Sequence, residues 1–408
     1  RTQRKMASNP NYSLLQDLKA LWEKARQKRL ARAERQPIIN RMLELSLGSL
    51  HSIIFQHDAA RIVQCMIRYG SAEQREKIHA ELVDHTLDLC RSKYSRHIVP
   101  KLLQFGTRAQ RAAIIRQFYG HVRKLIRQRI ASTVLASAFI DYATAPERKA
   151  LLAEFYGPQF ALFKDDAAQD VMQIVADQPT KKPYILRHMK QTLLPMLEKG
   201  LCSHLILHRA LLQYLQLADG TERAEMIDNV KELLVEMLHT QDGARLTIFC
   251  LEHTSAKDRK VIVRSFKPYV IKICMEEYGY LALLAALDVV DDTVLLRKMI
   301  LSEMEGSILE IAQDMYGRRV LFYLSSHRDK LYLSPQLYQS LEALDANEHT
   351  KKPMDTRRQE LLAAASPMLL NLVAEHAAEL CREGQTALLV KAILTNCVGD
   401  PTAAYEAI

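Results

Sequence analysis

The sequence predicts an all-α protein folded as a right-handed α-solenoid, a superhelix of three-helix repeats. The main observation is a recurring pattern of five residues. Its third and fourth residues are apolar in nearly every copy, and its first, second and fifth residues are expected to lie on another face of the helix. It runs from Ala60 to Gln64 and returns after steps of about 36 residues at Arg96 and Ser132. Glycine and proline number only 13 each among 408 residues, and 48% of residues are hydrophobic, so helices are favoured.

Further copies of the pattern continue down the chain with looser spacing. They begin at Ala168, His204, Ala244, Tyr280, Arg318 and, more weakly, Thr386. On a helix, the first and fifth residues of a copy share a face with the second beside them, while the third and fourth turn toward neighbouring helices. One stripe is therefore expected to pack the array, and the other to form a repeated surface that grips a long ligand.

The first 36 residues are expected to form a basic N-terminal helix that packs on the array. An apolar stripe through Leu14, Leu18 and Trp22 predicts a helix from Tyr12 to about Arg35. Trp22, the only tryptophan, is interpreted as the anchor of this helix. Pro37 then opens the next helix, which is expected to run to about Leu47.

Capping boxes mark the first helix of each repeat. The boxes are Ser71-x-x-Gln74, Thr107-x-x-Gln110 and Thr144-x-x-Glu147, with later starts at Asp219 and Ser255. Gly70 and Gly106 lie where the preceding helices end. Each repeat is therefore predicted to run as a cap, a helix, a short helix, the presented helix and a glycine.

Two polar stretches, 177–183 and 345–355, interrupt the array. Neither is long enough to act as a flexible linker between independent domains, but the array could bend into an L at the first. We expect a basic N-terminal helix at 1–36, N-terminal repeats at 37–176 and divergent C-terminal repeats at 177–408 that continue the first set.

Positive charge is concentrated toward the N-terminus. The net charge is +9; residues 1–35 hold ten Lys/Arg and three acids, a net +7, and residues 107–129 hold seven Lys/Arg and no acid. This distribution suggests a polyanionic partner, although solvated helix faces remain the alternative reading.

Little in the sequence supports catalysis or metal binding. No phosphate-binding glycine loop, nucleophile elbow or H-E-x-x-H motif is present, so we expect no enzymatic activity, cofactor or metal. His204 and His208 lie one turn apart but lack a third ligand, and we interpret them as part of a polar repeat face. The paired carboxylates at 276–277 and 291–292 are explained by roles at helix ends.

The cysteines, the apolar runs and the first residues of the chain bear on where the protein is found in the cell. Seven cysteines without C-x-x-C pairs are expected to be reduced and mostly buried, as in an intracellular protein. No apolar run is expected to span a membrane, and no signal peptide opens the chain. Because the chain starts with arginine, we expect it to be part of a longer protein.

The repeat period and its five-residue presented helix resemble the pumilio (Puf) repeat, most closely at Tyr94-Ser95-Arg96-His97-Ile98-Val99. More specifically, the chain resembles the divergent Puf-A or Penguin branch, the third pumilio homologue with a CPL-type C-terminal region. Stretches that carry this resemblance are 239–245, 257–263, 287–293, 316–321 and 357–362. The resemblance covers essentially the whole chain. It implies a nuclear, nucleolar protein that binds nucleic acid with little sequence preference and acts in large ribosomal subunit maturation.

The recurring positions carry almost no base-reading code. In sequence-specific Puf proteins, the first and fifth residues bond a base edge while the second stacks on the base. Only Ala60/Gln64 with Arg61 approaches such a set, and Pro100 has no side-chain donor or acceptor. Tyr94, Tyr278 and Tyr316, which precede presented helices, are interpreted as packing between repeats.

The leading hypothesis is a scaffold that binds structured RNA, with pre-rRNA as the expected target, and single- or double-stranded DNA through phosphates. The candidate nucleic-acid-binding residues are Lys24, Arg26, Lys28, Arg29, Arg61, Gln64, Arg96, His97, Lys101, Arg108, Arg111, Arg116, Arg123, Lys124, Arg127 and Arg129. Secondary basic candidates are Lys181, Lys182, Arg245, Arg318 and Arg319. For the arginines among them, contacts within the protein remain an alternative.

Two other functions remain open. One is an mRNA-specific translational repressor of the ordinary pumilio type, which the missing base code disfavours. The other is a protein-interaction solenoid that holds a ribosomal or assembly protein. In each case we expect a monomer that does not bind membranes.

Overall fold

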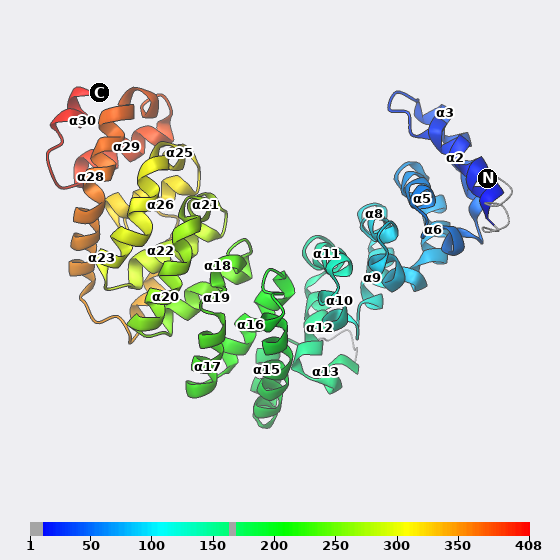
Figure 1. Ribbon diagram of the computed structural model, residues 1–408, viewed down its shortest axis with the longest axis horizontal. Coiled ribbons are helices and arrows are strands. Elements are labelled where there is room, and N and C mark those ends of the chain that lie inside the picture. Colours follow the sequence, from blue (N-terminus) through cyan, green and yellow to red (C-terminus); the bar gives the residue numbers. More distant parts are fainter. Residues whose placement is uncertain (1–10, 163–168) are drawn as a thin grey trace. The chain divides into compact units, whose positions relative to one another are not determined.

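The computed structural model of the protein describes residues 11–162 and 169–408. Every regular element in these ranges is a helix, which confirms the predicted all-α solenoid class (Figure 1). Contacts divide the chain into two compact units, Arg1–Thr192 and Leu193–Ile408, called unit 1 and unit 2. The predicted boundary after residue 176 lies near the end of α14 (Val171–Asp177), whereas this division falls within α15 (Lys182–Glu198).

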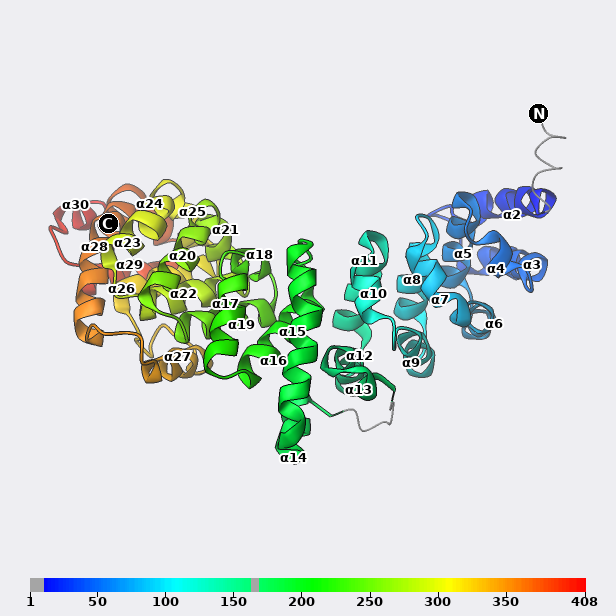
Figure 2. The same ribbon diagram turned by 60° about the horizontal axis from the view of Figure 1, so that its bottom comes forward.

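Unit 1 stacks its helices in chain order, as triplets of a first helix, a short middle helix and a third helix that carries the recurring pattern (Figures 1 and 2). Its elements are α2 (Tyr12–Ala25), α3 (Arg32–Ser46), α4 (Leu50–Ile53), α5 (His57–Tyr69), α6 (Ala72–Leu82), η1 (Val83–His85), α7 (Thr86–Arg91), η2 (Ser95–His97), α8 (Ile98–Phe105), α9 (Arg108–Gln117), α10 (Val122–Ile126), α11 (Arg129–Ser137), η3 (Ala138–Tyr142), α12 (Ala145–Tyr156), α13 (Pro158–Leu162), α14 (Val171–Asp177), η4 (Pro179–Lys181) and α15 (Lys182–Glu198).

Unit 2 repeats this triplet plan, and its last three helices pack against one another or against earlier helices of the unit. Its elements are α16 (Leu205–Leu217), α17 (Gly220–Val230), α18 (Leu234–Met237), α19 (Gln241–Glu252), α20 (Ala256–Phe266), η5 (Lys267–Tyr269), α21 (Val270–Met275), α22 (Gly279–Val289), α23 (Thr293–Leu296), η6 (Arg297–Leu301), α24 (Ser302–Met304), η7 (Glu305–Ser307), α25 (Ile308–Gln313), α26 (Gly317–Ser326), α27 (Pro335–Glu342), η8 (Ala343–Ala346), α28 (Met354–Leu380), α29 (Gly384–Asn396) and α30 (Thr402–Glu406).

The predicted capping boxes begin α6, α9 and α12. At α6, the backbone N–H of Gln74 donates to Ser71 Oγ at 3.2 Å, and the N–H of Ser71 donates to Gln74 Oε1 at 2.7 Å. In unit 2, Ser255 caps α20, whereas Asp219 makes no side-chain cap bond at α17. Each N-cap hydrogen bond that forms contributes about 1 kcal/mol to the stability of its helix. The starts of these helices are therefore determined by residues close in sequence.

An arginine four residues after each of these N-caps fastens the new helix to the end of the previous one. Its guanidinium donates to carbonyls that have no partner within their own helix. The pairs are Arg75 with Gly70 O (2.9 Å), Arg111 with Leu103 O (2.7 Å), Arg148 with Ala143 O (3.0 Å), Arg223 with Ala218 O (3.0 Å) and Arg259 with Leu251 O (2.7 Å). Successive repeats are therefore joined by charged hydrogen bonds as well as by apolar packing.

Gly70 and Gly106 end α5 and α8 as predicted, but for a different reason. Their φ values are −68° and −75°, which any residue can adopt. A Cβ at these positions would lie 2.6 Å from Met66 O and 2.5 Å from Leu102 O. Close approach of the backbone, rather than a left-handed conformation, requires glycine here.

The single helix predicted from Tyr12 to about Arg35 is wrong. The chain breaks after Ala25, and α3 begins at Arg32, so that Pro37 lies inside α3. Arg35 Nε donates to Ala25 O at 3.0 Å and stabilises the turn. Because the apolar stripe ends at Ala25, the cationic segment that follows has no apolar face to bury, and α3 instead folds back on α2.

α28 corrects the expectation that no apolar run is long enough to span a membrane. It meets that criterion by length and composition, and 50% of its apolar window is buried inside the protein. It packs against α26, α29 and α30, and its backbone is kinked at His376. These contacts account for its apolarity as that of a core helix.

Candidate nucleic-acid interface

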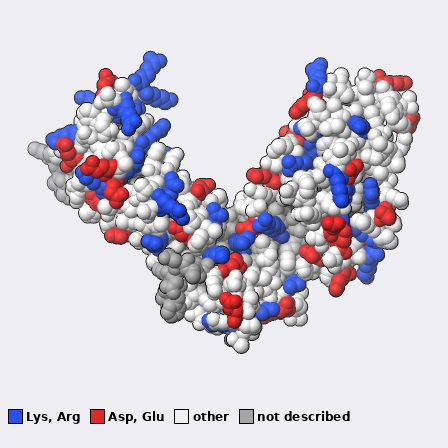
Figure 3. All heavy atoms as spheres, turned by 180° about the vertical axis from the view of Figure 1, so that it is seen from behind, with Lys and Arg blue, Asp and Glu red and all other residues white. Residues whose placement is uncertain are grey.

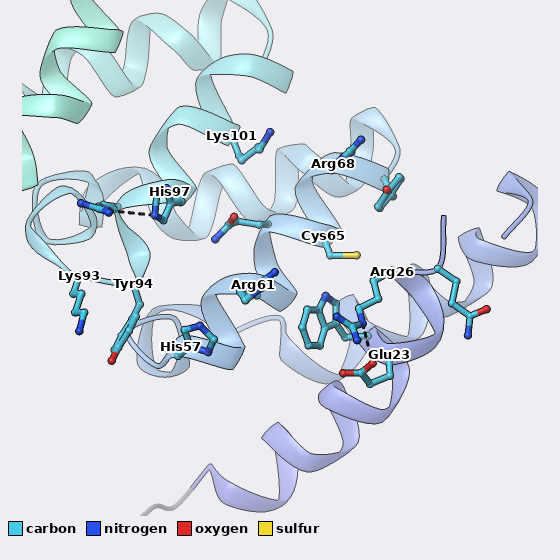
Figure 4. Close-up of a pocket in the computed structure, with 15 residues that line it drawn as sticks. Glu23, Arg26, His57, Arg61, Cys65, Arg68, Lys93, Tyr94, His97 and Lys101 are labelled. Atoms are coloured by element: carbon cyan, nitrogen blue, oxygen red, sulfur yellow. Dashed lines mark hydrogen bonds and ion pairs between the residues drawn. The ribbon is translucent and has the colours of Figure 1, made fainter. Parts of the chain in front are cut away.

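A cationic groove lies in unit 1 between α2, α5 and the segment from Lys93 to α8 (Figure 4). Six Lys/Arg side chains line it against the single carboxylate of Glu23. We define the cationic groove by these six residues, which are Arg26, Arg61, Arg68, Lys93, Arg96 and Lys101. Charges of one sign gathered in a groove concentrate the electrostatic potential and attract a polyanion.

Trp22 positions two of the groove arginines. It is 8% exposed and anchors α2 as predicted. The guanidinium carbons of Arg26 and Arg61 lie 4.9 Å and 5.9 Å from the indole centroid. Arg26 Nε also donates to Glu23 Oε2 at 2.8 Å. The indole therefore holds two cations at one wall of the groove through cation–π contacts.

The opposite wall is formed by η2 and α8. Arg96 Nε donates to His97 Nε2 at 3.2 Å, and Lys101 Nζ donates to Gln104 Oε1 at 2.7 Å. Burial and the adjacent Arg96 guanidinium lower the pKa of His97, so the imidazole is neutral at pH 7. The positive charge of this wall therefore comes from Arg96 and Lys101.

The structure brings six of the predicted nucleic-acid-binding residues together in the groove lining. These are Arg26, Arg61, Gln64, Arg96, His97 and Lys101. Gln64 is half-buried, and its position-one partner Ala60 is buried with 1% exposure. Of the set Ala60, Arg61 and Gln64, which comes nearest to a base-reading set, only the Gln64 amide beside Arg61 is therefore available to bond a base edge.

Other predicted cations are exposed but lie outside the groove lining. They are Lys24 at the end of α2, Lys28 and Arg29 in the turn that follows it, Arg108 and Arg116 on α9, and Lys124, Arg127 and Arg129 around α10 and α11. Figure 3 shows Lys and Arg side chains projecting from the end of unit 1 that carries α2 and α3, while both charge signs are interspersed over unit 2.

Arg111 and Arg123 require a correction, because both are half-buried and their guanidinium groups contact other parts of the protein. Arg111 fastens α9 to α8 and lies 5.4 Å from the Tyr142 ring centroid. Arg123 Nη1 lies 3.3 Å from both His188 Nε2 and Thr192 Oγ1. Their contacts are structural rather than directed toward a ligand.

The secondary basic candidates differ in burial and in the partners that they contact. Arg318 is 8% exposed and donates to Ala312 O and Gln313 O, so its prediction as a ligand-facing cation is corrected. Arg319 donates to the Tyr280 hydroxyl at 2.7 Å. Arg245 is exposed and lies 3.9 Å from Asp242. Lys181 lies over the Phe160 ring, and Lys182 also has an interaction partner.

The predicted repeated surface does not continue through unit 2. Tyr280 and Leu284, the first and fifth residues of one copy, are 5% and 0% exposed, and Phe322 in the next copy is 6% exposed. In that unit α19 packs against α22, and α22 against α26, so large side chains at these positions fill the space between presented helices. For the copy at 168–172, Ala168 lies outside the described residues.

His208 is also buried, which corrects the polar-face reading of His204 and His208. It is 0% exposed; its Nε2 lies 2.5 Å from Cys202 O and its Nδ1 lies 2.7 Å from Thr240 Oγ1. Burial lowers the pKa of His208 to about 3. In the described ranges, no group of three or more His, Cys, Asp or Glu residues could hold a metal ion. Five of the seven cysteines are buried, and Cys381 is exposed.

Arg68, Lys93 and Tyr94 are among the lining residues that sequence reasoning did not assign to nucleic-acid binding. Arg68 follows Gln64 by one helical turn, so continuing the face of α5 past the pattern would have found it. Tyr94 was assigned to packing but is 38% exposed. The same prediction is confirmed for Tyr316, whose ring stacks on Tyr280 at 5.5 Å between centroids.

The fold and groove agree with two family models. Residues 61–82 and 85–117, which include most of the groove, match the pumilio-family RNA binding repeat, and residues 313–408 match the CPL (NUC119) domain. Together with the three-helix repeats, these matches define a pumilio-type repeat protein, a class that is not a known enzyme family.

Comparison with individual proteins identifies the branch of the pumilio family to which the chain is similar. Human Pumilio homolog 3 is 38% identical over 406 residues, which is 99% of this chain, and the zebrafish (Danio rerio) Pumilio homolog 3 is 39% identical over 399 residues, 98% of it. The crystal structure of human Puf-A superposes with a TM-score of 0.88 at 39% identity, covering 97% of this chain and 78% of that one. Human Puf-A in complex with DNA gives the same TM-score and identity, with 97% and 79% covered.

The chain belongs to the Puf-A (Pumilio homolog 3) family. It spans about 63% of the length of the two curated relatives named above.

Proposed function

We propose that this chain is a scaffold that binds structured RNA and DNA through the phosphate backbone with little sequence specificity. The observation that carries the proposal is the cationic groove, with six Lys/Arg against one carboxylate. Phosphate contacts supply affinity that does not depend on sequence. The crystallised complex of human Puf-A with DNA supports this choice of ligand.

The groove offers little with which to read bases. The lining holds two side-chain amides, Gln27 after α2 and Gln64 on α5, and the position on α8 that corresponds to Gln64 is Pro100. A paired set of donors and acceptors on each base edge is what gives discrimination between bases. Affinity for unrelated sequences should therefore be similar.

We further propose a role in pre-rRNA processing and large ribosomal subunit biogenesis in the nucleolus. This part rests on the resemblance to the Puf-A branch. Crosslinking the protein to RNA in cells and sequencing the attached fragments tests it. Enrichment of pre-rRNA spacers would support the role, and a spread over mature mRNAs would favour the translational repressor instead.

A salt titration tests the binding mode. If the six groove cations each neutralise one phosphate, the slope of log affinity against log salt should be about −4 for a single strand and about −5 for a duplex. Affinity should differ little between unrelated oligonucleotides of equal length. A strong preference for one eight- or nine-base sequence would contradict the proposal.

Charge reversal locates the interface. The triple variant Arg61→Glu, Arg96→Glu, Lys101→Glu should abolish most of the affinity and make the salt slope shallower by about 2 to 3. Arg264→Glu, an exposed cation of unit 2, is the matched control and should change affinity little. The pair Arg127→Glu, Arg129→Glu measures the contribution of the exposed cations outside the groove. Unchanged affinity in the triple variant would overturn this assignment.

One observation favours protein binding as a second function, located in unit 2. A shallow groove there is lined by Pro268, Tyr269, Ile271 and Met275, of which Tyr269 is 51% exposed and Ile271 and Met275 are half-buried. Exposed apolar side chains of this kind are typical of protein contacts. Tyr269→Ser should then remove an assembly-protein partner from affinity purifications while leaving RNA affinity unchanged. Loss of RNA affinity in this variant would argue against the division of roles.

A further inference from the structure

Tyr94 presents an aromatic ring to the cationic groove. It lies in the turn between α7 and η2 and is 38% exposed. The ring meets His57 edge to face, with centroids 5.4 Å apart and an interplanar angle of 82°. Lys93 Nζ lies 5.4 Å from the ring centroid. Figure 4 shows Tyr94 between His57 and Lys93 at the side of the groove away from Glu23.

The turn that carries Tyr94 is fixed by a network of hydroxyl groups. Ser92 Oγ and Ser95 Oγ lie 3.1 Å apart, and the backbone N–H of Ser95 donates to Ser92 Oγ at 3.3 Å. Ser95 is 0% exposed, and its hydroxyl donates to Ile54 O of the preceding repeat at 2.8 Å. A ring held on such a turn loses little conformational freedom when a ligand stacks on it, so more of the contact energy appears as affinity.

The equivalent tyrosines of unit 2 lack this exposure. Tyr316 stacks on Tyr280, and the Arg319 guanidinium lies 5.5 Å from its ring centroid. Tyr278 and Tyr316 are half-buried, and of these three tyrosines in the same register Tyr94 alone lines the cationic groove.

We propose that Tyr94 is a stacking platform for an unpaired nucleobase, so that the groove binds a single strand more tightly than a duplex of the same sequence. The inference rests on the proposed function, because the surrounding cations must hold the phosphates. An aromatic face accepts any of the four bases, which agrees with low sequence specificity. A base within a duplex is stacked on its neighbours and cannot offer its face to Tyr94. Lys93 is then placed to contact a phosphate beside the stacked base.

The test compares Tyr94 variants on matched single-stranded and duplex DNA at fixed salt. Tyr94→Leu should weaken single-strand binding by about 5- to 150-fold, since stacking on an aromatic side chain is worth about 1 to 3 kcal/mol per base. Duplex affinity should change by less than about twofold, because the groove cations remain. Tyr94→Phe and Tyr94→Trp keep the stacking face and should retain the preference for a single strand. Tyr316→Leu, which removes the packed tyrosine of the same register, is the control and should leave the preference unchanged.

An oligonucleotide series supplies the second measurement. In a short single strand that fills the groove, an abasic residue at the stacked position should lower affinity for the wild type but not for Tyr94→Leu. Equal losses of single-strand and duplex affinity in Tyr94→Leu, together with no abasic effect in the wild type, would overturn the platform. Failure of the wild type to bind either nucleic acid would instead defeat the proposed function itself.

Discussion

Removing the guanidinium of Arg259 should loosen the polar loop that follows η8. Arg259 is 2% exposed and holds three segments together. It donates to Leu251 O at 2.7 Å, to Val289 O at 2.7 Å, to Thr350 Oγ1 at 2.8 Å and to Asn347 Oδ1 at 2.7 Å. Burial lowers the pKa of Arg259 to about 10, so the side chain is still charged at pH 7.

The size of the effect follows from these four short bonds. A hydrogen bond from a charged donor is worth about 1.5 to 3 kcal/mol net, and the cost of burying the guanidinium offsets part of the sum. Breaking a buried charged network by removing one partner typically costs about 3 to 5 kcal/mol. We expect this cost for Arg259→Met, which keeps much of the apolar stem. Arg75→Met, at the same repeat position with one bond to Gly70 O, should cost about 1.5 kcal/mol, the lower end of the range for a bond from a charged donor, because Arg75 is only half-buried.

Hydrogen exchange measured by mass spectrometry gives the local free energy. The amides of Thr350 and Lys351 donate to Asn347 Oδ1 at 2.9 Å and to Asp291 Oδ2 at 2.8 Å, so they report directly on the loop. Their protection should fall by about 100-fold or more in Arg259→Met. Arg75→Met should leave them unchanged. Protection within about threefold of wild type would show that Arg259 does not hold the loop.

Three further outcomes are expected. His208 has a folded-state pKa of about 3, below its ordinary value, so the unfolded chain takes up a proton at a higher pH than the folded chain does. The free energy of unfolding should therefore fall by about 1.4 kcal/mol per pH unit below pH 6.5. In His208→Gln, denaturation curves recorded over the same pH range should show a smaller fall. Gly106→Ala should destabilise the protein by about 1 to 3 kcal/mol in thermal melts, because the added Cβ would clash with Leu102 O. A Cβ added at Gly384 has no atom within 4 Å, so Gly384→Ala should be neutral or slightly stabilising. Cys381, the exposed thiol, should be alkylated first by iodoacetamide, and earlier modification of a buried cysteine in peptide mapping would contradict that order.

Features that depend on neighbours in the chain could be predicted from the sequence. The capping box at Ser71 and Gln74 and the end of α5 at Gly70 involve residues a few positions apart, and both were confirmed. The break after Ala25 could not be foreseen in the same way. It depends on Arg35 reaching back to carbonyls at the end of α2, a contact across a turn that periodicity does not reveal.

Exposure at the recurring positions depends on how adjacent repeats pack, and it was predicted only in part. Arg96 and Arg318 both occupy the first position of their copies. Arg96 lines the cationic groove, whereas Arg318 is 8% exposed and bonded to carbonyls of the preceding helix. Likewise, Arg108 and Arg111 share α9, yet the second is bound to the end of α8. A single sequence pattern cannot separate these cases, because the distinction lies in the spacing between helices.

The buried recurring positions of unit 2 limit how its presented helices can be re-engineered. In a repeat whose first and fifth side chains are exposed, a new recognition preference can be installed by exchanging those side chains alone. At Tyr280 and Leu284, a Ser/Gln or Asn/Gln pair would leave cavities and unpaired amides in the core, at a cost of about 2 to 5 kcal/mol for each large side chain lost. Grafting a base-reading code onto this unit would therefore require rebuilding the packing between α22 and α26.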